Sequence, residues 1–104
     1  MFTESSAIGS LPRYSGRRNL HHAAFFCHAP QAKQVYLIGD FNRWDPTATP
    51  MTKQPDGRWM IGLDLSHGYH RYLFWVDGKR VLDPNASGKA RYAHNEHVSL
   101  RAIS

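Results

Sequence analysis

The 104-residue chain lacks several features that mark large classes of protein. It has a single cysteine, Cys27, and therefore cannot form an intrachain disulfide. No apolar run approaches the roughly 18 to 20 residues that cross a bilayer, and the first ten residues lack the basic start and apolar centre of a secretory signal. We therefore expect a cytoplasmic protein without membrane association, in which Cys27, among apolar neighbours, is a buried and non-catalytic thiol.

The sequence also lacks catalytic and metal-binding motifs. It contains no Gly-x-Ser-x-Gly elbow, no phosphate-binding glycine loop and no His-Glu-x-x-His. No pair of carboxylates stands out for glycoside hydrolysis, because Asp56, Asp77 and Asp83 are explained by turns. The histidines do not have the spacing of a zinc site, and the adjacent His21 and His22 would face opposite sides of a strand. We therefore expect no enzyme, no metal and no cofactor.

Acidic residues are scarce relative to basic ones. Eight Asp and Glu oppose 13 Lys and Arg, which gives a net charge of +5. This balance permits binding to anions, including nucleic acid. The basic residues are nevertheless spread along the chain, and Arg17 and Arg18 form a short cluster. The charge pattern therefore does not favour nucleic acid, and a neutral ligand would leave the positive charge unexplained.

The chain does contain a series of short strand patterns. Apolar alternation bounded by turn residues predicts strands at 20–28, 33–39, 51–54, 59–65, 69–76, 79–82 and 97–103. Asp77-Gly78 has the composition of a type I′ hairpin turn, whereas the stretch 83–92 is polar and predicted to be irregular. Six to eight short strands with short connections predict an all-β, antiparallel β-sandwich over residues 19–104. Residues 1–18 show no periodicity and are expected to form a flexible tail.

A tryptophan follows the second predicted strand at a place where no periodicity requires it. Residues 35–38 form an apolar strand, Gly39 ends it, and turn-forming residues such as Asn42 follow. Trp44 lies among these polar turn residues. An indole there either folds back onto the domain or faces a ligand, and the C–H face of a sugar ring suits an aromatic surface.

The run Gly39-Asp40-Phe41-Asn42-Arg43-Trp44 resembles the Gly-x-Phe-Asn-x-Trp signature of the family 48 carbohydrate-binding modules. That family includes the glycogen-binding domain of the AMP-activated protein kinase β subunit and the N-terminal domains of isoamylases and glycogen branching enzymes. The resemblance covers roughly residues 20–103 and continues through Asp56-Gly57-Arg58-Trp59, Gly68-Tyr69-His70-Arg71-Tyr72-Leu73-Phe74-Trp75-Val76-Asp77-Gly78 and Asp83-Pro84. It implies an immunoglobulin-like sandwich that binds α-1,4-linked glucans without catalysis.

The resemblance also assigns sugar-binding roles. Trp44 matches a tryptophan that stacks on glucose, and Asn95 matches an asparagine that hydrogen-bonds sugar hydroxyls. A second family tryptophan falls where this chain has Arg80, and a lysine falls where it has Leu73. Because an arginine plane packs on a sugar face and donates hydrogen bonds, we expect Arg80, together with Trp75, to substitute for the altered contacts.

The same resemblance orients the strand 69–76. Its core face would carry Tyr72, Phe74 and Val76. Its outer face would carry Arg71, Leu73 and Trp75. An outward Leu73–Trp75 pair would be an exposed apolar patch, which either a ligand or another part of the chain covers.

We therefore expect a non-catalytic module that binds glycogen-like or starch-like α-glucan through Trp44 and recruits a separate glycogen-metabolising enzyme or kinase. The alternative is a protein-interaction module of the same fold that has lost sugar binding and docks a partner through Leu73, Trp75 or the tail. A nucleic-acid binder is the third hypothesis. It would lose affinity steeply with salt, whereas neutral-glucan binding would hardly respond.

Overall fold

The computed structural model of the chain describes residues 20–92 and 96–104. The expected tail, residues 1–18, lies outside this described part. Within it, no helix is long and apolar enough to cross a membrane. The elements follow in the order β1 (Leu20–His28), β2 (Val35–Gly39), the 3₁₀-helix η1 (Asp40–Asn42), β3 (Thr52–Lys53), β4 (Arg58–Ser66), β5 (Gly68–Val76), β6 (Lys79–Val81), β7 (Gly88–Tyr92) and β8 (Glu96–Ile103).

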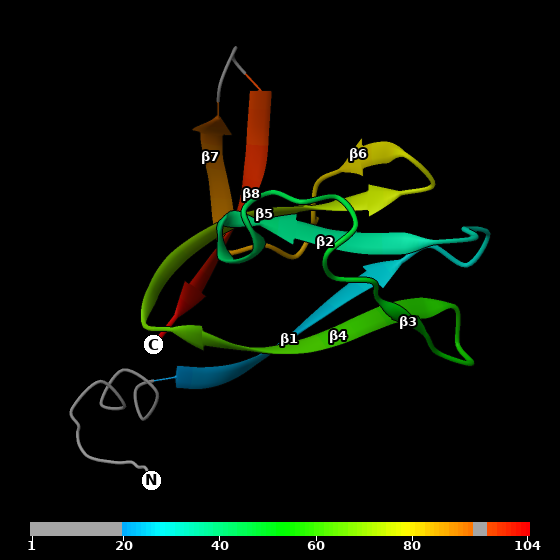
Figure 1. The fold of residues 1–104 in the computed structure, drawn as a ribbon, viewed down its shortest axis with the longest axis horizontal. Helices are drawn as coiled ribbons and strands as arrows, with labels where there is room; N and C mark the ends of the chain where they lie inside the picture. Colours follow the sequence, from blue (N-terminus) through cyan, green and yellow to red (C-terminus); the bar gives the residue numbers. More distant parts are fainter. Residues whose placement is uncertain (1–19, 93–95) are drawn as a thin grey trace, which may run out of the picture.

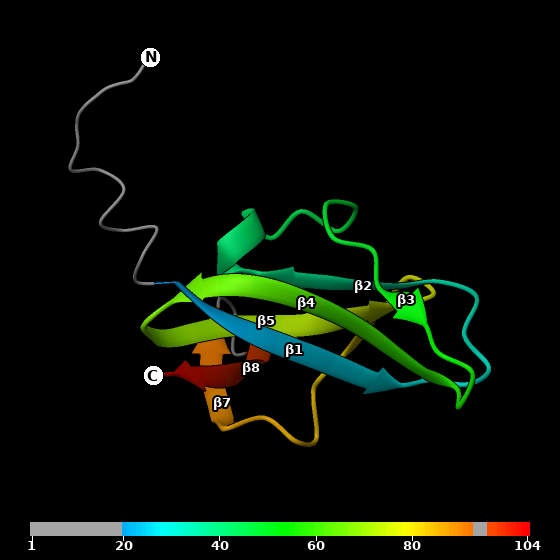
Figure 2. The ribbon, with the colours of Figure 1, turned by 90° about the horizontal axis from the view of Figure 1, so that it is seen from below.

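The strands form two antiparallel sheets that pack face to face (Figures 1 and 2). The smaller sheet has the order β1-β4-β3, and the larger has the order β2-β5-β8-β7, with β6 paired to the far end of β5. The predicted all-β, immunoglobulin-like antiparallel sandwich is confirmed. The predicted strands agree with the observed ones to within two residues. The stretch 83–87 is irregular as expected, but the expectation is wrong for 88–92, because β7 lies there.

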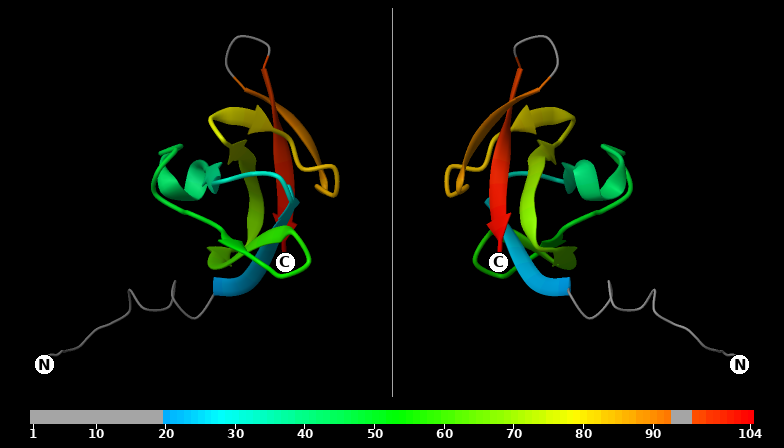
Figure 3. Two further views of the ribbon diagram at one scale, coloured as in Figure 1. Left: turned by 90° about the vertical axis from the view of Figure 1, so that its right-hand side faces the viewer. Right: turned by 90° about the vertical axis from the view of Figure 1, so that its left-hand side faces the viewer.

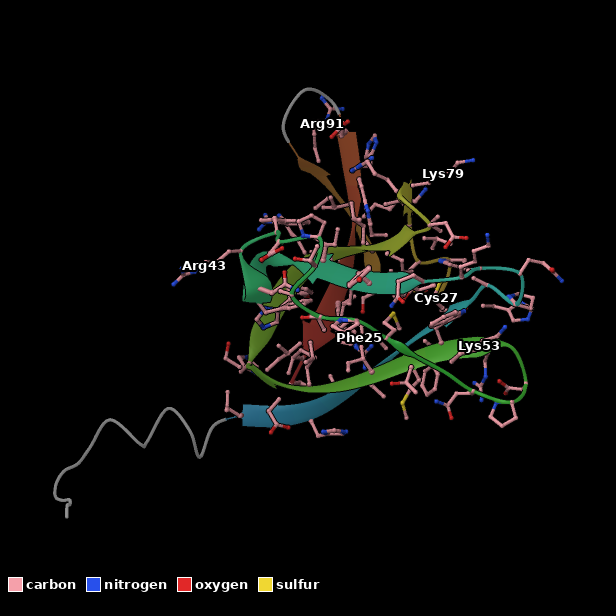
Figure 4. All side chains as sticks on the ribbon, turned by 45° about the vertical axis from the view of Figure 1, so that its right-hand side comes forward. Phe25, Cys27, Arg43, Lys53, Lys79 and Arg91 are labelled. Atoms are coloured by element: carbon pink, nitrogen blue, oxygen red, sulfur yellow. The ribbon has the colours of Figure 1, made fainter. Side chains whose placement is uncertain are left out.

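The core lies between the two sheets, where Figure 4 shows Phe25 and Cys27. Phe25 meets Tyr72 edge-on, with ring centroids 5.0 Å apart, and Tyr72 meets Phe74 in the same way at 5.9 Å. These aromatic contacts confirm the predicted core face of β5. Cys27 is buried as expected, and burial raises the pKa of its thiol to about 11.

Two hydrogen bonds with buried side chains fix the segment that follows β6. The Tyr72 hydroxyl donates to a carboxylate oxygen of Asp83 at 2.6 Å. The Asp83 N–H in turn donates to the buried hydroxyl of Ser99 at 2.7 Å. Burial, followed by the hydrogen bond to Asp83, raises the pKa of Tyr72. The Asp83-Pro84 pair is therefore a structural turn tied to the core.

An arginine fastens the two sheets together. Arg101 of β8 donates from Nη1 to the carbonyl of Ala24, in the middle of β1, at 2.9 Å. Its guanidinium carbon also lies 4.8 Å from the centroid of the Phe25 ring, which is a cation–π geometry. Strand β1 is an edge strand of the smaller sheet. The positive charge of Arg101 therefore lies at this edge, on a carbonyl of β1.

The larger sheet divides where β8 leaves β5. Strand β5 pairs with β8 over residues 68–72 and with β6 over residues 74–76. Beyond this point β7 and β8 rise away from β5, as Figures 1 and 3 show, while β6 stays beside the end of β5. Side chains of β5, β6 and β8 meet at the divide, on the face turned away from the core.

Candidate functional site

The loop after β2 is built around the side chain of Asn42. The Gly39 N–H donates to Asn42 Oδ1 at 3.0 Å. Asn42 Nδ2 donates to the carbonyl of Leu37 at 2.8 Å and to the hydroxyl of Thr49 at 3.0 Å. One amide thus ties together the end of β2, the η1 turn and the segment that returns towards β3.

Asp40 and Phe41 anchor the same loop to the sandwich. A carboxylate oxygen of Asp40 accepts the Arg71 N–H at 2.9 Å, and the other lies 3.1 Å from Nδ1 of His70. The Phe41 ring lies 5.9 Å from the Phe25 ring and packs against the core. These contacts fix η1 against β5, so the residues that follow it start from a defined position.

Two consecutive left-handed residues then reverse the chain. Arg43 has a φ of 59° and Trp44 a φ of 57°, values that side-chain-bearing residues rarely adopt. The Trp44 N–H donates to the Gly39 carbonyl at 2.9 Å. The Arg43 side chain points away from the domain (Figure 4), whereas Trp44 packs back on the outer face of the larger sheet.

Hydrogen bonds between Asp45 and Thr47 fix the part of the loop that follows Trp44. Asp45 Oδ1 accepts hydrogen bonds from both the N–H and the hydroxyl of Thr47, each at 2.9 Å. These two bonds hold the pKa of the Asp45 carboxyl below its usual range, because they favour the charged form. Hydrogen bonds within the loop therefore fix its backbone before Trp44, through Asn42, and after Trp44, through Asp45.

Trp44 completes a pocket of about 220 Å³ on the outer face of the larger sheet. The floor is a small apolar cluster of nearly buried side chains, to which β2, β5 and β8 contribute Ile38, Leu73 and Val98. Trp44 and Trp75 are only partly buried and pack against this cluster. The complete lining is Ile38, Trp44, Pro46, Leu73, Trp75, Arg80, Glu96 and Val98.

Arg80 supplies the polar side of the pocket. It lies directly opposite Trp75 in the β5–β6 ladder, after an Asp77-Gly78 turn whose two positive φ values, 48° and 84°, confirm its predicted type I′ character. One guanidinium nitrogen, Nη2, donates to the carbonyl of His97 at 3.1 Å and lies 3.8 Å from a carboxylate oxygen of Glu96. These β8 contacts hold the guanidinium at the pocket that Trp75 also lines.

The pocket gathers the predicted site residues Trp44, Leu73, Trp75 and Arg80. Asn95 lies outside the described residues. Leu73 faces the outer side of the sheet as expected, and of the two expected outcomes the structure shows cover by another part of the chain, since its exposed fraction is only 4%. The Trp44 loop and the neighbouring strands cover it, so Leu73 forms the floor of the pocket instead of a free patch.

The sequence did not predict the other lining residues. Ile38 alternates with the core residue Leu37 on β2, so its outward direction was available from the strand pattern. Glu96 and Val98 enter the pocket because β8 passes beside Arg80 and Leu73 at the divide, and no local pattern reveals that contact. Among residues 20–92 and 96–104, no group of three potential metal-ligating side chains lies close enough to hold an ion.

The carbohydrate-binding module 48 profile (isoamylase N-terminal domain) matches residues 12–93. The chain belongs to this family. The family 48 module is 43% identical over 53 residues to 5′-AMP-activated protein kinase subunit beta-1 of Homo sapiens, a match that covers 51% of this chain and 18% of the relative. It is 46% identical over 63 residues to the 1,4-alpha-glucan branching enzyme GlgB of Aquifex aeolicus, which covers 57% of this chain and 10% of that protein.

The fold of the module also matches a solved structure. The crystal structure of maltogenic amylase from S. marinus superposes with a TM-score of 0.69 and 28% identity, over 80% of this chain and 13% of that one. The module therefore spans less than a fifth of the length of each of these relatives. The similarity concerns one domain of larger proteins.

Proposed function

We propose that this family 48 module binds α-1,4-linked glucan, such as glycogen or starch, and does not catalyse its conversion. The proposal rests chiefly on one observation: Trp44 and Trp75 line a single pocket whose polar side is Arg80. Indole faces stack on the C–H faces of sugar rings, and a guanidinium donates hydrogen bonds to hydroxyls. Membership of a carbohydrate-binding family supports the class of ligand.

Each residue that the sequence assigned to the site has a proposed role. Trp44 is the main stacking surface, and Trp75 with Arg80 takes the place of the second tryptophan of the family pattern. Leu73 supports both indoles from below because it is the buried floor between them. Asn95 is proposed to hydrogen-bond sugar hydroxyls, on the strength of its sequence match alone.

We further propose that the module recruits a catalytic partner to the polymer. The similar proteins include a subunit of a kinase and a glucan branching enzyme, each much longer than this chain. A separate glycogen-metabolising enzyme or kinase is therefore the proposed partner. A single buried, reduced Cys27 fits a cytoplasmic setting.

The test is a chemical-shift titration with maltoheptaose and β-cyclodextrin, with cellohexaose as the control for glucan linkage. We expect saturable shifts at the Trp44 indole with the two α-glucans alone. Trp44→Ala should weaken maltoheptaose binding by roughly tenfold or more, a loss of at least about 1.4 kcal/mol. Phe26→Ala is the matched control, because Phe26 is an exposed aromatic on the other sheet.

Two results would count against the proposal. One is an absence of shifts at millimolar maltoheptaose, and the other is an affinity that Trp44→Ala leaves unchanged. Either would turn attention to the protein-interaction alternative. That alternative would then depend on Trp75 or the tail, because Leu73 is buried.

A further inference from the structure

The outer face of β5 continues beyond the pocket. Side chains alternate along a strand, and Tyr72 and Phe74 are in the core. The outer line along β5 therefore runs through Trp75, Leu73, Arg71 and Tyr69. On the neighbouring strand β8, Leu100 lies opposite Arg71 and Ala102 lies opposite Tyr69.

Tyr69 is the most exposed large apolar side chain in the described part, with an exposed fraction of 69%. Single exposed aromatics are common on protein surfaces and need no function of their own. Tyr69 differs from the exposed Phe26 in its position, because it shares a strand and a face with the pocket. Its cross-strand neighbour Ala102 is small and leaves room beside the ring.

Arg71 lies between the pocket and Tyr69. Its main-chain N–H is bonded to Asp40. Its side chain is exposed, and its guanidinium has no hydrogen-bond or ion-pair partner among residues 20–92 and 96–104. Several N–H donors therefore face solvent on the line that joins Leu73 to Tyr69.

The length of this line suits an oligosaccharide. At roughly 3.3 Å per residue of strand, the path along β5 from Leu73 to Tyr69 is about 13 Å long. A single sugar ring does not bridge that distance, whereas a chain of several rings does. An aromatic face at one end and free donors in between are the groups that recognise such a chain.

We propose that Arg71 and Tyr69 form a second subsite, which holds the continuing end of an α-glucan whose first rings occupy the Trp44 pocket. Tyr69 stacks on a distal glucose ring, and Arg71 donates hydrogen bonds to hydroxyls along the way. The inference rests on the proposed glucan binding. It makes the module selective for long chains, because short oligosaccharides fill the pocket alone.

Calorimetric titration with maltotriose and maltoheptaose tests this proposal. The wild-type protein should bind maltoheptaose more tightly than maltotriose. Tyr69→Ala should weaken maltoheptaose binding roughly threefold to tenfold and leave maltotriose unchanged. Tyr69→Phe, which keeps the ring, should retain the preference for the longer chain, and Phe26→Ala should have no effect on either ligand.

The outcomes separate the subsite from the pocket. If Tyr69→Ala leaves the preference for maltoheptaose intact, or weakens both ligands equally, the second subsite is wrong while the pocket stands. Equal wild-type affinity for the two oligosaccharides would overturn it as well. If the wild-type protein binds neither, the proposed function itself fails and the subsite fails with it.

Discussion

Asn42 shows how the loop motif Gly39–Trp44 works at the scale of single residues. Its amide makes three hydrogen bonds, to Leu37, Gly39 and Thr49, and it does not line the pocket. Trp44 is the member of the motif that lines it. Asn42 therefore acts on any ligand indirectly, by holding the loop that carries the indole.

We predict that Asn42→Ala lowers the free energy of unfolding by about 1–3 kcal/mol, because it leaves the partly buried Leu37 carbonyl and Gly39 N–H without their partner. Urea unfolding measures this loss. Asn85→Ala is the control, since Asn85 is exposed and its bond to Asp83 uses the main chain. A change within about 0.5 kcal/mol is expected for the control, and equal losses in the two variants would refute the role of Asn42.

At the scale of elements, the junction between β2 and η1 is closely packed. A Cβ atom at Gly39 would lie 2.5 Å from the Phe41 ring and 2.7 Å from the Arg71 carbonyl. The backbone of Gly39 is extended and unstrained, with φ −166°. Glycine is therefore required there by space, so that the turn can approach β5.

We predict that Gly39→Ala destabilises the fold by about 1–3 kcal/mol, because the turn has to move to make room for the methyl group. Gly88→Ala in β7 is the matched control, since its Cβ would meet only the Leu100 side chain, at an ordinary 3.8 Å. Thermal melting of both variants measures the difference. Gly39→Ala should also shift the Trp44 indole resonance, and a melt and spectrum like those of Gly88→Ala would contradict the steric argument.

Strands that bury one face on the core were predictable from the sequence. The alternation through Trp59, Ile61, Leu63 and Leu65 predicted β4 and its inward face, and all four side chains are buried or pack against the core. Strand β7 was missed because Gly-Lys-Ala-Arg-Tyr has almost no apolar alternation. It is the outer strand of the larger sheet, beside β8, where the two strands leave β5 (Figure 1).

The pocket was predictable only in part. The motif identified Trp44, and the strand face identified Leu73 and Trp75. Which segments cover Leu73 was not predictable, because the cover comes from Trp44, on a loop nearly thirty residues earlier, and from Val98 on β8. Such contacts depend on the meeting of three separate segments, which no local pattern specifies.

At the scale of the whole molecule, a buried thiol and a buried phenol make the free energy of unfolding depend on pH. The thiol of Cys27 has a pKa raised from 9.0 to about 11 by burial and by the charge of Asp83. The pKa of Tyr72 is raised in the same direction. Both groups hold their protons more tightly in the folded chain than in the unfolded one. Their contribution to the free energy of unfolding is therefore complete below about pH 9 and is lost as pH rises.

We predict that the free energy of unfolding falls above pH 9 and that Cys27 alone accounts for about 2 kcal/mol of the loss at pH 11. Urea unfolding of the reduced protein between pH 8 and pH 11 measures this dependence. Cys27→Ala should remove the thiol contribution and keep that of Tyr72, giving a shallower decline. Parallel curves for the two proteins would show that the thiol is not the group responsible.

The guanidinium of Arg101 has a consequence for how separate molecules behave towards one another. A strand with one unpaired edge is a template to which a foreign strand can add, and this is a common route to aggregation. To add at the centre of β1, an incoming chain would have to displace a charge-assisted hydrogen bond to Ala24 and a cation–π contact with Phe25. We therefore expect the side chain that joins the sheets also to oppose strand addition between neighbouring copies.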